Sequence, residues 1–293
     1  MSNRLFPTLS ALFAVIVWGA SFIATKVALR DVSPVTVVWL RFAMGVVILG
    51  IAVAARKQFA LPNRSEWGYF ALLGFLGITF HQWLQSTGLL TSQASTTAWI
   101  VATTPVFMAL LGWLALKESL GWTQSGGILL AAAGVILVVS QGDLSSLALG
   151  QFGQPGDVLI LVSSLNWAVF SSLSRRGLKT HPAAQMMFYV MTFGWLFTSL
   201  LLFAGPGLAE IPQLTFDGWL GVAFLGVFCS GLAYIAWYDA LRALPAAQTG
   251  AFLYIEPLVA MVVAAFVLAE TVTAATLVGG AVILLGVWLV NRR

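Results

Sequence analysis

The sequence predicts an all-α integral membrane protein of ten transmembrane helices, arranged as two inverted five-helix repeats. Three observations support this prediction. Hydrophobic residues make up 60% of the chain and charged residues only 8%, so too few polar side chains remain to cover the surface of a soluble domain. Apolar runs of about 18 or more residues recur along the whole chain, and each is long enough to cross a bilayer as a helix. The third observation is an internal duplication.

The duplication is visible in two apolar segments that each carry a proline and end at a glutamate. Pro105 and Glu118 stand in the first segment, and Pro257 and Glu270 stand in the second. The offset is the same for both residues, since 257 − 105 and 270 − 118 both equal 152. Without a gap, the same offset aligns further pairs: Trp67 with Trp219, Gly74 with Gly226, Thr97 with Thr249, Gly127 with Gly279, and Gly134 with Gly286. The chain therefore consists of two copies of one unit.

The apolar runs are continuous and do not alternate with polar residues, so they predict helices and not the strands of a membrane barrel. We expect the ten helices at residues 6–25, 34–55, 67–88, 94–116, 121–139, 157–173, 182–204, 217–241, 246–268 and 273–290. The longest connection, residues 140–156, is rich in Gly, Ser and Gln and is the expected linker. The predicted domains are residues 1–142 and residues 155–293, each a five-helix repeat.

Lysine and arginine residues predict the orientation, because they concentrate on the cytoplasmic side of membrane proteins. With the N-terminus inside, eleven of the 14 basic residues lie on the inner side: Arg4, Arg56, Lys57, Arg64, Lys117, Arg175, Arg176, Lys179, Arg242, Arg292 and Arg293. Lys26 and Arg30 lie outside, and Arg41 falls within a predicted helix. We therefore expect both termini in the cytoplasm. Because each copy has an odd number of helices, the second copy is upside down relative to the first.

An inverted repeat is typical of secondary transporters, in which the substrate site lies between the halves near the membrane midplane. Duplication can also merely enlarge a helical bundle, and this alternative stays open. Polar and aromatic residues within the predicted helices favour transport, because a purely structural bundle has little use for them.

Several stretches resemble EamA-type transporters of the drug/metabolite transporter superfamily. These are WGASFIATK at residues 18–26, LRF at residues 40–42, the two proline-to-glutamate segments, and the glycine-bearing helices at residues 126–139 and 278–290. The resemblance covers nearly the whole chain and extends to YddG-type exporters of aromatic and other neutral amino acids. It implies a ten-helix transporter of small metabolites that often works outward, in a bacterial cytoplasmic (inner) membrane.

Other classes of function are disfavoured. The basic residues form no patch or stripe, so the formal charge of +4 does not indicate nucleic acid binding. A single cysteine, Cys229, excludes a disulfide framework and a four-thiolate metal site. The sequence has no Walker A motif, so we expect no cofactor and no metal, and no ATPase subunit is implied. The expected partners are the lipid bilayer and a small-molecule substrate such as an amino acid.

The third predicted helix carries His81 and Gln85 one turn apart, on the face that also presents Gly74, Gly77 and Gly88. Polar side chains inside a membrane tend to face the bundle interior or a cavity. Substrate contact is the functional interpretation of His81 and Gln85. A satisfied hydrogen bond between helices is the structural alternative.

Aromatic and polar residues in other helices are candidates for binding an amphiphilic substrate. Tryptophan usually concentrates at membrane interfaces, but Trp18, Trp99, Trp167 and Trp237 fall within the predicted helices. In a cavity their rings supply flat apolar walls, whereas facing lipid they serve only packing. The remaining candidates for substrate binding are Thr103, which shares a helix face with Trp99, together with Asn166 and Tyr234.

Arg41 and Glu256 are the charged residues predicted to lie deepest in the bilayer, and such residues are candidates for function. Arg41 either extends toward Glu270 or pairs with Glu256. Glu256 either binds a proton or a substrate amine, as a coupling site, or is a buried structural acceptor.

Two prolines predict helix kinks. Pro105 and Pro257 each remove one helical hydrogen bond and free the carbonyl groups of Val101 and Leu253. A packing kink is one interpretation. In the other, a freed carbonyl accepts a hydrogen bond from a substrate ammonium group.

The predicted function is secondary transport by alternating access, with export of small amphiphilic metabolites, above all neutral or aromatic amino acids. Efflux of lipophilic cationic drugs is an alternative that needs Glu256 as its anionic site. An intramembrane enzyme acting on lipid is a remote alternative, because His81, Arg41 and Glu256 fall on three different helices. We assign no catalytic residue.

Overall fold

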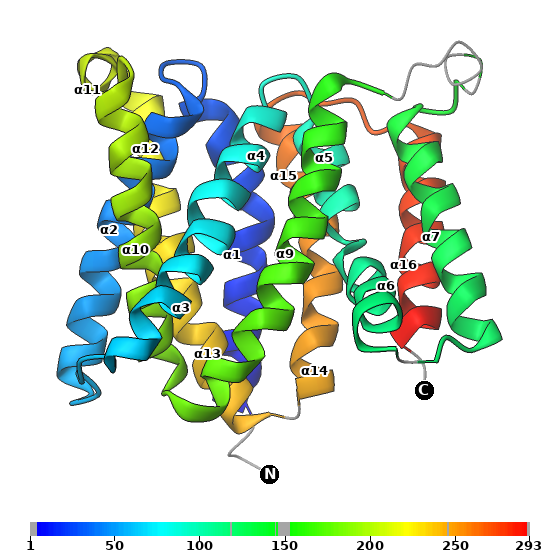
Figure 1. Cartoon of the computed structure of the whole chain (residues 1–293). Helices are drawn as coiled ribbons and strands as arrows, with labels where there is room; N and C mark the ends of the chain where they lie inside the picture. Colours follow the sequence, from blue (N-terminus) through cyan, green and yellow to red (C-terminus); the bar gives the residue numbers. More distant parts are fainter. Residues whose placement is uncertain (1–4, 118, 144, 146–152, 245, 292–293) are drawn as a thin grey trace.

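The computed structural model describes residues 5–117, 119–143, 145, 153–244 and 246–291. All regular structure in these residues is helical, and nine helices among them are long and apolar enough to cross a membrane. The chain is therefore an integral membrane protein with multiple spans, which pack side by side (Figure 1). Helix α1 begins, and helix α16 ends, at the same end of the bundle. Glu118 lies outside the described residues.

The first copy contains α1 (Leu5–Ala28), α2 (Pro34–Ala55), α3 (Arg64–Gly74), the π-helix η2 (Phe75–Phe80), α4 (His81–Gly88), α5 (Ala94–Val101), α6 (Thr104–Leu116) and α7 (Trp122–Val139). Elements α3, η2 and α4 follow one another without a break and form one helical segment. This segment is not among the nine apolar helices, so the count of ten spans stays a prediction.

The second copy contains α9 (Pro155–Thr180), α10 (Ala183–Ala204), the short α11 (Gly207–Glu210) and 3-10 helix η3 (Ile211–Gln213), α12 (Phe216–Ala223), the π-helix η4 (Phe224–Leu232), α13 (Ala233–Ala243), α14 (Ala246–Ala251), the 3-10 helix η5 (Phe252–Ile255), α15 (Glu256–Val267) and α16 (Ala274–Asn291). Helices α12 and α13, with η4 between them, form one segment.

Helix boundaries in the two copies repeat the offset of 152 residues found in the sequence. Helix α7 begins at Trp122 and α16 at Ala274, and the two helices end at Val139 and Asn291. The segments 64–88 and 216–243 each contain a π-helix at the corresponding place. A π-helical turn holds one residue more than an α-helical turn and frequently marks a functional site.

Helices α7 and α16 pack against each other through matching glycines (Figure 1). A Cβ atom added at Gly127 would lie 2.7 Å from the carbonyl oxygen of Gly286, and one added at Gly134 would lie 2.8 Å from that of Gly279. Gly127 corresponds to Gly279 in the repeat, and Gly134 corresponds to Gly286. Each glycine of α7 therefore contacts the α16 glycine that is equivalent, in the repeat, to the other glycine of α7. Two antiparallel helices related by a two-fold axis make contacts of this kind.

Helix α9 is longer than predicted. It continues past Leu173 to Thr180, so Arg175 and Arg176 lie on a helix and not in a connecting loop. The added turns are held by Tyr69, whose hydroxyl donates to the carbonyl of Leu173 and accepts from the amide of Gly177, both at 2.9 Å. A helix ends where its backbone loses its partners, which need not be where the apolar run ends.

Candidate substrate-binding site

The first group of aromatic side chains joins α1 to α13. The ring of Trp18 lies 5.5 Å from that of Tyr234 and 5.3 Å from that of Trp237, centroid to centroid. Its indole Nε1 donates to the carbonyl of Cys229, in the π-helix η4, at 3.1 Å. We call Trp18, Tyr234 and Trp237 the α1–α13 aromatic group. Its members come from both copies of the repeat.

A second group joins α4 to α9. The imidazole of His81 lies 4.7 Å from the ring of Trp167, which lies 4.8 Å from the ring of Phe170. His81 Nδ1 is 3.1 Å from the carbonyl oxygen of Ser163, which fixes the orientation of the imidazole. We call His81, Trp167 and Phe170 the α4–α9 aromatic group, and it too combines both copies.

The π-helix η2 supports the second group. A Cβ atom added at Gly77 would lie 2.5 Å from the ring of Phe170, so this ring fits only against a glycine. The amide of Asn166 donates to the carbonyl of Leu76 at 2.7 Å. The predicted candidate Asn166 therefore binds the backbone of a neighbouring helix.

Gln85 is buried one turn after His81. Within the part of the chain that the structure describes, its side-chain amide has no hydrogen-bond partner. A polar group of a substrate would give this amide a hydrogen-bond partner.

Arg41 is buried and bonded to two neutral side chains. Its Nε donates to the hydroxyl of Ser230 at 3.1 Å, and its Nη1 donates to the side-chain oxygen of Gln82 at 3.0 Å. Neither of the predicted acidic partners, Glu256 and Glu270, forms an ion pair with it in the described residues. The sequence did not identify Gln82 and Ser230 as its partners, because the rotation of each helix about its own axis decides which residues meet.

Glu256 begins α15 and is partly buried. A Cβ atom added at Gly19 would lie 2.7 Å from the carbonyl oxygen of Glu256, so this residue lies against α1 next to Trp18. Among the described residues, its carboxylate has no hydrogen-bond or ion-pair partner.

The helices that carry Pro105 and Pro257 are interrupted near the prolines. The first has a turn at Ala102 and Thr103 before α6 begins, and the second has the 3-10 helix η5 before α15. The carbonyl of Val101 accepts a hydrogen bond from the Thr104 hydroxyl at 2.7 Å, and that of Leu253 accepts from the amide of Glu256. Both freed carbonyls therefore have partners within the chain, which favours a structural role for the kinks.

Trp99 and Thr103 lie apart from both aromatic groups. The ring of Trp99 is 2% exposed and packs against Gly280 of α16, where an added Cβ atom would lie 2.5 Å from the ring. The hydroxyl of Thr103 donates to the carbonyl of Ile100 at 2.6 Å, within its own segment. In this conformation both side chains belong to the packed core beside α7 and α16.

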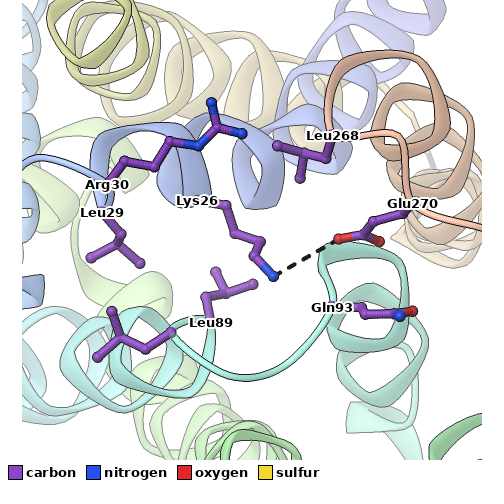
Figure 2. Close-up of a pocket in the computed structure, with 8 residues that line it drawn as sticks. Lys26, Leu29, Arg30, Leu89, Gln93, Leu268 and Glu270 are labelled. Carbon is purple, nitrogen blue, oxygen red and sulfur yellow. Dashed lines mark ion pairs between the residues drawn. The ribbon is translucent and has the colours of Figure 1, made fainter. Parts of the chain in front are cut away.

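The end of the bundle at which α1 ends is held together by Lys26. Its Nζ donates to the carbonyl of Ser92 at 2.6 Å and lies 3.9 Å from Glu270 (Figure 2). Glu270 accepts hydrogen bonds from the amides of Ala94 and Ser95 at 2.7 and 3.1 Å, at the beginning of α5. The Ser92 hydroxyl donates to Asp157 of α9 at 2.5 Å.

A pocket of about 310 Å³ lies outside these contacts. It is lined by the three charged residues Lys26, Arg30 and Glu270 and by Leu29, Leu89, Leu90, Gln93 and Leu268. The sequence identified Lys26 and Glu270 only as residues near the outer surface. No pattern within one helix could have shown that they meet, because they stand 244 residues apart (270 − 26).

Comparison with known proteins adds the family. A family model described as "EamA-like transporter family" matches the chain twice, at residues 5–140 and at residues 154–292. The chain belongs to the EamA-like transporter family. The two matches fall on the two copies of the repeat.

Relatives of this EamA-like transporter cover nearly the whole chain. An uncharacterized transporter of Archaeoglobus fulgidus is 28% identical over 279 residues, which is 95% of this chain and 94% of the relative. A probable terminal-alkyne amino-acid exporter of Streptantibioticus cattleyicolor is 28% identical, with 95% and 91% covered. The uncharacterized inner membrane transporter YedA of Escherichia coli is also 28% identical, with 92% and 86% covered.

A solved crystal structure shares the fold of this EamA-like transporter, with a TM-score of 0.68 and 20% identity, and covers 98% of this chain and 97% of the other. The family membership makes the chain a secondary transporter of a small-molecule substrate and not an enzyme.

Proposed function

We propose that the chain is a secondary exporter of neutral amino acids, aromatic ones included, and that it works by alternating access. The observation that carries this proposal is the pair of aromatic groups, each built from one helix of each copy. Each group is close to a polar side chain that has no hydrogen-bond partner in the described part of the chain. Gln85 follows His81 by one turn, and Glu256 lies beside Trp18. Aromatic walls with a few placed polar groups suit an amphiphilic solute.

The exporter named among the relatives supports an amino acid as cargo. In the proposal, the two aromatic groups hold the side chain of the amino acid, and Gln85 hydrogen-bonds a polar group. Trp99 and Thr103 take a structural part in it, since neither reaches the aromatic groups in this conformation.

The proposal also includes ten spans arranged as two inverted halves, with residues 64–88 as the third span. The glycine pairs of α7 and α16 support the inverted arrangement, because only a two-fold axis across the helices exchanges equivalent positions in this way. We place both termini in the cytoplasm because of the bias in basic residues. The name of the relative YedA supports the inner membrane as the location.

In the proposal, the outer contacts of Lys26 form and break in each cycle of alternating access. In this structure they are formed, and they join α1, the connection between α4 and α5, and the connection before α16. The site between the halves is then closed toward the outside, and release to the outside follows their opening.

Purified protein in liposomes tests the proposal. Liposomes preloaded with unlabelled phenylalanine should accumulate labelled phenylalanine by exchange, whereas protein-free liposomes should not. A panel of other amino acids, with and without an imposed pH gradient, then defines the range of cargo and the coupling. Labelled tetraphenylphosphonium tests the efflux of lipophilic cations, which the unpartnered Glu256 keeps as a second candidate. Transport of the cation without transport of any amino acid would contradict the proposed function.

A further inference from the structure

We propose that Arg41 and Glu256 recognise the two charges of a zwitterionic α-amino acid. In this arrangement Arg41 binds the carboxylate and Glu256 binds the ammonium group. The inference rests on the proposed function, because it names the chemical feature by which the cargo of the same site is selected.

Arg41 has donors to spare and no negative partner. Its hydrogen bonds go to the neutral oxygens of Ser230 and Gln82, through Nε and Nη1. No acceptor in the described residues takes a hydrogen bond from Nη2. A guanidinium group binds a carboxylate through two parallel hydrogen bonds, and a buried guanidinium without a counter-charge is costly in a membrane. A substrate carboxylate would supply the missing charge.

Among the described residues, Glu256 lacks a positive partner, as Arg41 lacks a negative one. Its carboxylate has no hydrogen-bond or ion-pair partner in the part of the chain that the structure describes. The backbone carbonyl of Glu256 stands against Gly19, so the neighbouring residue Trp18 brings the α1–α13 aromatic group close to this residue. Aromatic rings attract cations through their faces, so the rings of this group would also stabilise an ammonium group bound at Glu256.

Tyr234 connects the two charges. Ser230, which binds Arg41, precedes Tyr234 by four residues and so lies on the same side of the helical segment. Trp18, next to the Glu256 contact, has its ring 5.5 Å from that of Tyr234. Arg41 and Glu256 thus each lie next to a neighbour of Tyr234, which is Ser230 for Arg41 and Trp18 for Glu256.

This arrangement selects for a zwitterion. A solute that carries an ammonium group and a carboxylate on the same carbon atom neutralises Arg41 and Glu256 together. A lipophilic amine pairs with Glu256 but leaves Arg41 unpaired, and a carboxylic acid pairs with Arg41 but leaves Glu256 unpaired. Either partial match leaves a buried charge without a partner, so we expect the site to reject both.

Competition on the wild-type protein in liposomes tests the inference without any variant. Labelled phenylalanine is the probe, and the competitors are unlabelled phenylalanine, phenethylamine (no carboxylate) and 3-phenylpropionate (no ammonium). We expect each of the last two to compete about tenfold or more weakly than phenylalanine, because each lacks one charge-assisted contact. Equal competition by phenethylamine would overturn the inference while leaving amino-acid transport intact. If no amino acid is transported at all, the proposed function fails and the inference fails with it.

Two variants assign the charges. In Arg41→Gln, phenethylamine should compete as well as phenylalanine, and in Glu256→Gln, 3-phenylpropionate should do so. Arg64→Gln removes an exposed positive charge at the beginning of α3 and should retain the wild-type selectivity. Folding is compared by size-exclusion elution in detergent. Folded variants that keep the wild-type order of competitors would overturn the assignment, and if neither variant folds, the wild-type competition decides.

Discussion

The side-chain nitrogen of Lys26 lies 2.6 Å from the backbone carbonyl oxygen of Ser92, and this hydrogen bond joins the end of α1 to the connection between α4 and α5. The same nitrogen is 3.9 Å from Glu270, which caps the beginning of α5. Three segments therefore meet at one ammonium group. In the proposed orientation, an opening of the bundle toward the outside breaks these contacts.

Removal of the Lys26 charge should open the outer end. In a Cys229→Ser background, a cysteine placed at Ser21, below Lys26 on α1, reports access from outside. We expect Lys26→Gln to raise its rate of labelling by a membrane-impermeant maleimide roughly tenfold, as follows if the lost contacts contribute about 1.4 kcal/mol to closure. Arg30→Gln removes a nearby charge that forms no ion pair among the described residues, and it should not change the rate. Equal rates in all three proteins would show that Lys26 does not hold the outer end closed.

The glycine contact between α7 and α16 should be intolerant of side chains. Gly127→Ala places a methyl group 2.7 Å from the carbonyl oxygen of Gly286, and overpacking of this kind costs about 1–3 kcal/mol of stability. The neighbouring Gly126 has no atom near its Cβ position within 4 Å, so Gly126→Ala should leave the thermal midpoint unchanged or raise it. The two midpoints are measured in the same detergent. A Gly127→Ala protein as stable as Gly126→Ala would contradict the close packing.

Trp167 and Trp99 should respond differently to truncation. Trp167→Ala removes a ring of the α4–α9 aromatic group, and we expect transport of phenylalanine and leucine to weaken about tenfold more than that of alanine or threonine. Trp99→Ala empties a space in the packed core and should lower stability by about 3–5 kcal/mol. Transport of each amino acid and the thermal midpoint are measured for both variants. Equal loss for large and small amino acids in folded Trp167→Ala would mean that the ring does not recognise the cargo.

Cysteine labelling tests the proposed orientation. In the Cys229→Ser background, a cysteine at Ser145, in the connection between the copies, should react with an impermeant thiol reagent added to intact cells. A cysteine at Arg176, near the end of α9, should react only after the membrane is permeabilised. Both positions are exposed in the structure, so accessibility within the protein does not limit either reaction. The opposite pattern would reverse the orientation.

The membrane class and the duplication could be predicted from the sequence, because both follow from composition and residue spacing and do not depend on how the helices pack. Length and apolarity are sufficient for a span, and an offset shared by Pro105–Pro257 and Gly127–Gly279 is sufficient for a repeat. The π-helices η2 and η4 could not be predicted. They depend on the shape of the helices that pack against them, such as the ring of Phe170 on Gly77.

The site could be predicted only as a set of candidates. In a soluble protein the polar face of a helix shows which side is buried, but in lipid the outer side is as apolar as the core, so the sequence does not fix the rotation of each helix. Trp18 and Trp237 were therefore candidates without a known neighbour, and the structure places their rings in contact. For the same reason Trp99 was indistinguishable by sequence from Trp167.

The seam between α7 and α16 also limits how the two copies can diverge. Gly127 meets Gly286 and Gly134 meets Gly279, so the two glycines of α7 face the two glycines of α16 that are equivalent to them in the repeat. A larger residue at one of these positions restricts the size of the residue that it contacts on the other helix. During evolution the sequences of the two copies can diverge independently where they line the path of the solute. At the contact between α7 and α16, a substitution in one copy requires a compatible residue in the other.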